Sequence, residues 1–87
     1  MKRFWLSFCD TDKPAGSQFL GVALVRAHSL PEAIRVAHVL GINPGGEVQS
    51  LELPDGLKID GGSMEQLLSR VEAEALWQEL EAQMEAL

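Results

Sequence analysis

The sequence predicts an α+β domain: a small sheet of about three strands in β-β-α-β-α order, followed by a long C-terminal helix. Three observations predict this class. Large apolar residues alternate with smaller or polar ones over residues 2–9, as in a half-buried strand. Residues 19–27 are apolar on both faces, which is typical of a strand covered on both sides. Helical periodicity follows the capping motifs that begin at Ser29 and Ser63.

The first predicted strand runs from residue 2 to residue 9. Phe4, Leu6 and Phe8 face one side, and Trp5, Ser7 and Cys9 share the other side with Arg3. A polar loop over residues 10–18 contains a proline and a glycine and leads to the second strand, residues 19–27. Strict alternation places Leu20, Val22 and Leu24 on one face of this strand, and Phe19, Gly21, Ala23, Val25 and Ala27 on the other.

The first predicted helix covers residues 30–40. Ser29 can cap the amide of Glu32, and Gly41 suits the left-handed position after the helix. Residues 47–53 form the third predicted strand, with Leu51 and Leu53 inward. A helix between the second and third strands is the crossover of a parallel pair, and the first strand can lie between them, antiparallel to both. The expected buried stripe of the helix consists of Leu30, Ala33, Ile34, Ala37 and Leu40.

The chain is long enough for one domain, which we divide into residues 1–62, the sheet and crossover helix, and residues 63–87, the C-terminal helix. If this helix starts at Ser63, its apolar residues form two stripes on opposite sides, one over residues 64–75 and one over residues 73–87. One straight helix cannot bury both stripes against one surface, so we expect the second to form the interface of a homo-oligomer. The alternative is a monomer whose kinked tail folds back. The interface stripe consists of Trp77, Leu80, Met84 and Leu87.

Composition and charge limit the function. Residues 1–46 carry five basic side chains against three acidic ones, and residues 47–87 carry two against ten, for a net charge of −6. This balance argues against nucleic acid as a partner and places any site for a small anion in the N-terminal half. No apolar run is long enough to span a membrane, and no signal peptide is expected. With one cysteine, the chain is expected to be cytoplasmic.

The turn over residues 40–48, LGINPGGEV, contains three of the eight glycines. Asn43-Pro44-Gly45-Gly46 fits a type II turn, in which Pro44 supplies φ near −65° and Gly45 the positive φ. Alternatively, the two glycines let backbone amides approach an anion or a polar ring. The turn is not a P-loop, because the GxxxxGK[ST] pattern is absent. It is not a dinucleotide fingerprint either, because it follows a helix and does not open one.

A second candidate site is the sheet face that carries Trp5, Ser7 and Phe19, where small neighbours leave room for a flat ligand to stack on an aromatic ring. The alternative is that the C-terminal helix fills this space with apolar side chains, namely Leu67, Leu68 and Val71. Cys9, His28 and His38 have no metal-ligand or catalytic spacing. We therefore expect no enzyme, no metal site and no cofactor.

The runs FWLSFCD, FLGVA and LGINPGGEV resemble a group of small phage and bacterial proteins of no settled function. The resemblance covers residues 4–53 and transfers no catalytic or binding residue. The resemblance implies a phage or mobile-element setting. In that setting, small oligomeric proteins of other families sequester nucleotide-derived immune signals. Extending that anti-defence role to this chain is an analogy.

Together these observations favour a non-enzymatic homo-oligomer that holds a small anionic or nucleotide-like ligand between the sheet and the glycine turn. The alternative is a protein-interaction module or inhibitor that acts through the C-terminal helix. The expected ligand-binding residues are Trp5, Ser7, Arg26, Asn43, Gly45, Gly46 and Glu47.

Overall fold

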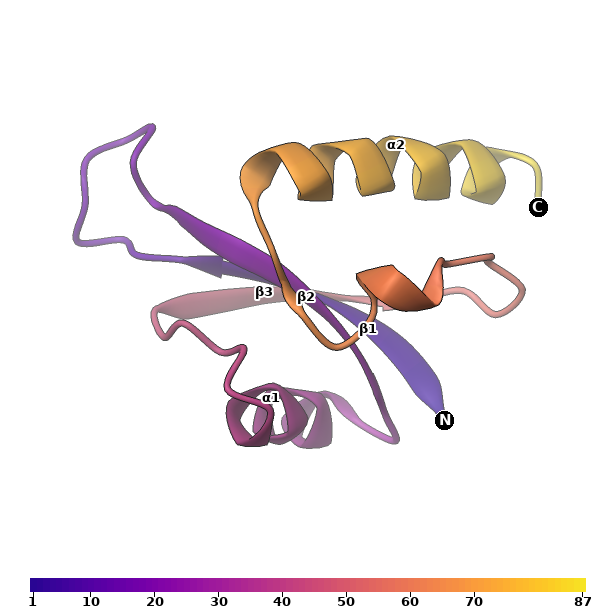
Figure 1. Ribbon diagram of the computed structural model, residues 1–87, viewed down its shortest axis with the longest axis horizontal. Helices are drawn as coiled ribbons and strands as arrows, with labels where there is room; N and C mark the ends of the chain where they lie inside the picture. The colour runs from indigo at the N-terminus through magenta and orange to yellow at the C-terminus, as the bar shows by residue number, and fades with distance from the viewer.

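In the computed structural model, which describes residues 1–87, a four-stranded sheet lies between two helices (Figure 1). The α+β prediction is confirmed, with one short strand more than expected. The elements along the chain are β1 (Lys2–Cys9), β2 (Phe19–Ala27), α1 (Leu30–Val39), β3 (Glu47–Leu53), the 3₁₀ turn η1 (Gly61–Ser63), β4 (Leu67–Leu68) and α2 (Arg70–Glu85).

The strand order is β3-β1-β2-β4, and all neighbouring strands are antiparallel. Because β1 is antiparallel to both β2 and β3, those two strands run parallel to each other on either side of it. This is the predicted arrangement, with α1 as the crossover between them. β4 adds two residues at the outer edge of β2, where Leu68 pairs with Val22 and Leu67 with Ala23.

A hydrophobic cluster lies on each face of the sheet. The predicted inward face of β1 is confirmed, because Phe4, Leu6 and Phe8 are buried against α1 and touch Ala33 and Ala37. The opposite cluster lies under α2 and contains nine buried residues: Val22, Leu24, Leu53, Leu57, Met64, Leu68, Ala73, Leu76 and Leu80. The two layers explain why β2, which lies in the middle of the sheet, is apolar on both faces.

The predicted faces of β2 are wrong at its first two residues. The pairing with β1 slips between Phe8 and Cys9, so that Phe8 lies opposite Gly21 and Cys9 opposite Phe19. Leu20 is the extra residue of this bulge, and Gly21 has a φ of +146°. Phe19 therefore packs on the α2 side, and Leu20 packs on the α1 side.

Both ends of α1 follow the prediction to within one residue. The Ser29 hydroxyl accepts a hydrogen bond from the Glu32 amide at the start. At the end, Gly41 takes a φ of +75°, and the Ile42 amide donates to the Ala37 carbonyl at 3.0 Å, which is the Schellman arrangement. The predicted stripe is wrong at its two ends. The helix buries Ala33 and Ala37 and leaves Leu30 and Leu40 exposed.

The C-terminal helix begins at Arg70, seven residues later than predicted. Ser69 is its N-cap, and a complete capping box links Ser69 to Glu72. Before it, Glu65 has a φ of +60° and its amide donates to the Leu24 carbonyl at 2.8 Å. The segment over residues 65–68 thus satisfies the free edge of β2, which a helix through the same residues would leave unpaired.

This late start removes the reason for the predicted interface stripe. With residues 64–68 outside the helix, α2 needs to bury only one face, and that face meets the sheet. Leu80 is fully buried in this chain's own core, and Trp77 and Met84 are half-buried beside it. Leu87 alone is well exposed, at 74%. The kinked tail of the alternative is not seen either, since α2 runs as one helix from Arg70 to Glu85. Neither helix is long and apolar enough to cross a membrane.

Candidate functional site

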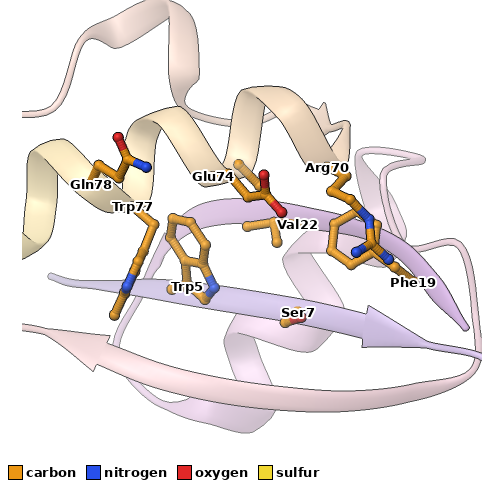
Figure 2. A pocket seen from close by; sticks show the side chains of 9 residues that line it. Trp5, Ser7, Phe19, Val22, Arg70, Glu74, Trp77 and Gln78 are labelled. Atoms are coloured by element: carbon orange, nitrogen blue, oxygen red, sulfur yellow. The ribbon is translucent and has the colours of Figure 1, made fainter. Parts of the chain in front are cut away.

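A hollow of about 330 Å³ lies between the first half of α2 and the β1–β2 part of the sheet (Figure 2). It adjoins a second hollow of about 270 Å³ that extends over β3 and shares Trp5, Ser7 and Trp77 with it. We call the two together the tryptophan groove. The first part is lined by Trp5, Ser7, Phe19, Val22, Arg70, Ala73, Glu74, Trp77 and Gln78; the second adds Gln49, Ser50 and Leu51.

The groove exists because small side chains face each other at this point. Ser7 on β1 and Ala73 on α2 both line it, and neither reaches across the space between helix and sheet. Further along α2, the larger side chains Leu76 and Leu80 are buried in the cluster between helix and sheet. The alternative that apolar side chains of the C-terminal segment fill the groove is not realised. Leu67 is 39% exposed and Val71 76% exposed, and Leu68 is buried in the core without lining the groove.

Two tryptophans stand where the two parts of the groove meet. Trp5 rises from β1, and Trp77 descends from the second turn of α2 (Figure 2). Their ring centroids are 5.1 Å apart and their planes cross at 62°, an edge-to-face contact. The indole N–H of Trp77 donates to the Glu81 carboxylate at 3.1 Å, which orients the ring from the solvent side. The pair offers fixed aromatic surface to each part of the groove.

The other end of the first hollow is polar and aromatic. Arg70 is the first residue of α2, and its guanidinium lies 5.2 Å from the centre of the Phe19 ring, within cation–π range. Glu74 and Gln78 follow at four-residue intervals, so all three side chains form one row along the helix. Glu74 extends from this row toward the sheet near Val22 (Figure 2). One cation and one carboxylate therefore border the same cavity.

The structure brings only part of the predicted ligand set together. Trp5 and Ser7 line the groove as predicted. Arg26 is exposed and lies 4.0 Å from Glu65, outside the groove. The remaining four predicted residues belong to the glycine turn, which lies beyond the end of β1 and lines neither hollow: Asn43, Gly45, Gly46 and Glu47.

The glycine turn is explained by local structure. Gly45 has a φ of +89°, the positive value that a type II turn needs at that position, and its amide donates to the Asn43 side chain at 2.9 Å. No backbone hydrogen bond joins the Gly46 amide to the Asn43 carbonyl, so the type II turn itself stays a prediction. Gly46 has a φ of +75° and lies so close to β1 that a Cβ would collide with the Cys9 carbonyl. These glycines allow the chain to pass tightly over the end of the sheet before it enters β3.

Sequence reasoning missed Arg70, Glu74 and Gln78. The sequence predicts these residues in the middle of a longer helix, and the orientation of that helix depends on where it starts. The available signal was the second S-x-x-E motif, Ser69 to Glu72, which lies six residues after the motif that begins at Ser63.

No three histidine, cysteine, aspartate or glutamate side chains come together in a way that could hold a metal ion. Cys9 is a half-buried free thiol at the end of β1. No known protein family matches the sequence, and neither a curated protein nor a solved structure matches the chain.

Proposed function

We propose that the protein binds a small planar ligand in the tryptophan groove and does not convert it. The observation that carries this proposal is the open cavity of about 330 Å³ whose lining includes Trp5, Phe19 and Trp77. Small-molecule sites are typically concave, largely apolar and marked by a few polar groups, and this cavity has that composition. Aromatic rings held by a strand and a helix offer stacking surface with little loss of side-chain freedom on binding.

The polar groups favour a nucleotide-like ligand. A base that stacks against Trp5 can donate ring or amino N–H groups to the Glu74 carboxylate. Arg70 lies within the same cavity and can bind a phosphate with its guanidinium. The anion-binding residue in this proposal is therefore Arg70, in place of Arg26 and the amides of the glycine turn.

Binding without conversion agrees with the residues around the groove. Covalent catalysis of the Ser–His or Cys–His type needs a nucleophile beside a histidine base, and the lining residues include no histidine or cysteine. A protein that binds a nucleotide-derived signal and leaves it intact lowers the free concentration of that signal. We therefore propose sequestration, the role that the phage resemblance implies by analogy.

Intrinsic fluorescence tests the proposal directly. The chain has two tryptophans and no tyrosine, and both tryptophans line the groove. A ligand that stacks there should quench or shift nearly all of the tryptophan emission. The experiment titrates the protein with mononucleotides, cyclic dinucleotides, free bases and inorganic phosphate, and follows emission and thermal unfolding in parallel. A ligand present at 100 times its dissociation constant adds about 2.7 kcal/mol to the unfolding free energy.

Matched variants separate the groove from the rest of the surface. Arg70→Gln should weaken binding of phosphorylated ligands at least tenfold and change the affinity for free bases little, because it removes a charge-assisted contact of about 1.5 kcal/mol or more. Arg35→Gln removes the same charge from the exposed side of α1 and should have no effect. If no member of the panel changes the emission or the unfolding temperature, the small-ligand proposal is wrong.

A further inference from the structure

Strand β3 is the least covered part of the sheet. Both helices pack mainly against β2, and neither makes more than marginal contact with β3. Four consecutive residues of β3, 49–52, are exposed, although alternate residues point to opposite faces. Leu51 is 40% exposed among them. β3 is also an edge strand, because its only neighbour is β1. A seven-residue strand thus has one free edge and two open faces.

We infer that two copies of this chain pair through β3, antiparallel and about a two-fold axis at Ser50. Such pairing would join the sheets into one of eight strands, with both α2 helices on the same face. A strand edge leaves backbone N–H and C=O groups free to pair with another strand, and a second copy of the same edge supplies the matching groups. The other outer strand, β4, has only two residues and therefore far fewer backbone groups for pairing.

The β3 sequence is self-complementary in this register. Ser50 lies opposite the partner's Ser50, Gln49 opposite the partner's Leu51, and Glu52 opposite the partner's Val48. No carboxylate faces a carboxylate, and the two exposed leucines become diagonal neighbours, within reach of each other across the strands. Pairing centred one residue later, on Leu51, would instead bring the two Glu52 side chains into diagonal contact.

Charge supports the same register at the ends of the strand. Glu47 has no ion-pair partner in its own chain, whose ion pairs are Lys2–Glu52 and Arg26–Glu65. In the proposed dimer Glu47 lies opposite the partner's Leu53, and the partner's Arg3 is the next residue across the sheet. The Arg3 guanidinium reaches toward the free edge, since it lies 3.5 Å from the Pro54 carbonyl. Two strand spacings, about 10 Å, separate the two backbones, a distance that these long side chains span.

The partner would also complete the groove. The second hollow is open beyond Gln49, Ser50 and Leu51, which form its outer side. The partner's Leu51, opposite Gln49, would close that side and bring the two copies' grooves close to the two-fold axis. The dimer itself does not depend on a ligand, so its test is carried out without one.

Engineered cysteines test both the dimer and its register. Cys9→Ser first removes the native thiol. Ser50→Cys then places two thiols directly opposite each other, with Cβ atoms about 4.5–5.5 Å apart, close to disulfide geometry. Under a mild oxidant it should form a covalent dimer at least about tenfold faster than Glu52→Cys, which lies opposite Val48, and than Val71→Cys on the exposed side of α2. Light scattering after size exclusion should give the uncross-linked protein twice the mass of one chain at high micromolar concentration.

A charge test addresses the same axis without covalent bonds. Ser50→Lys and Ser50→Glu should each raise the dimer dissociation constant about fivefold, because each places like charges opposite one another. Their equimolar mixture should recover a heterodimer. A chain that remains monomeric up to several hundred micromolar would overturn the inference and leave Glu47 and Glu52 as protection against edge pairing. A dimer that cross-links through Val71→Cys in preference to Ser50→Cys would overturn it as well.

Discussion

Replacing Gly46 with alanine should destabilise the fold far more than the same change one residue earlier, at Gly45. Both glycines have left-handed backbones, with φ of +75° and +89°, so each alanine carries a backbone penalty of about 1–2 kcal/mol. A Cβ at Gly45 meets open space. At Gly46 it collides with the Cys9 carbonyl and approaches Leu20 Cδ1 to 3.0 Å.

The size of the difference follows from what would have to move. Cys9 pairs with both neighbouring strands, opposite Phe19 and Glu47, so its carbonyl cannot shift without disturbing the end of the sheet. Overpacking of this kind typically costs a further 1–3 kcal/mol or so. We therefore expect Gly45→Ala to lower the unfolding free energy by about 1–2 kcal/mol and Gly46→Ala by about 2–5 kcal/mol.

The assay is thermal unfolding followed by far-UV circular dichroism, with urea unfolding as a second measurement. A difference of about 2 kcal/mol corresponds to roughly 8–16 °C in melting temperature for a domain of this size. Both variants should keep the wild-type spectrum at low temperature. Equal melting temperatures for the two variants would refute the reasoning, since the close approach of Gly46 to β1 is all that separates them.

Three further predictions concern α2 and the residues that flank it. Ser69→Ala should cost about 1 kcal/mol because it removes the N-cap, whereas Ser63→Ala should stay within about 0.5 kcal/mol; equal losses would contradict a helix that starts at Arg70. The hydrogen bonds that Glu72 accepts from the Ser69 backbone and then from its side chain lower the Glu72 pKa below its ordinary value of 4.5. The stability from its charge is therefore fully present above that value and lost as pH falls through the lowered pKa. The melting-temperature gap between wild type and Glu72→Gln should be constant from pH 7 to about pH 5 and narrow below pH 4.5; a gap that widens on acidification would contradict the assignment. Leu80→Ala should lower the free energy of unfolding by about 2–5 kcal/mol and Leu87→Ala by less than about 0.5 kcal/mol, as measured by urea unfolding. Similar losses for the two variants would contradict the burial of Leu80.

The elements that the sequence predicted correctly are those whose causes are local. The alternation of Phe4, Leu6 and Phe8 predicts both a strand and its buried face, because the side-chain period of a strand is a property of the backbone. Ser29 and Gly41 predict the ends of α1 because a cap needs only its own neighbours. The order of the three long strands followed from the crossover rule for parallel strands, which depends on the order of elements alone; the short strand β4 was not predicted.

The candidate site depended on two features that no local rule contains. The bulge at Leu20 places Phe19 and Val22 on the same face, where strict alternation separates them, and a single extra residue in a strand leaves almost no mark in a sequence pattern. The two capping motifs at Ser63 and Ser69 are equally good helix starts by sequence.

Which of the two serines caps the C-terminal helix depends on the folded sheet. The free edge of β2 needs the hydrogen bonds that residues 65–68 supply, so the helix begins after these residues. That choice sets the orientation of α2, and with it which side chains meet the sheet. The sequence by itself determined the three long strands, the crossover helix and the positive φ of Gly45. The tertiary structure decided that Leu80 belongs to the core and that Arg70, Glu74 and Trp77 border the groove, because hydrogen-bond demand at a strand edge is a property of the assembled sheet.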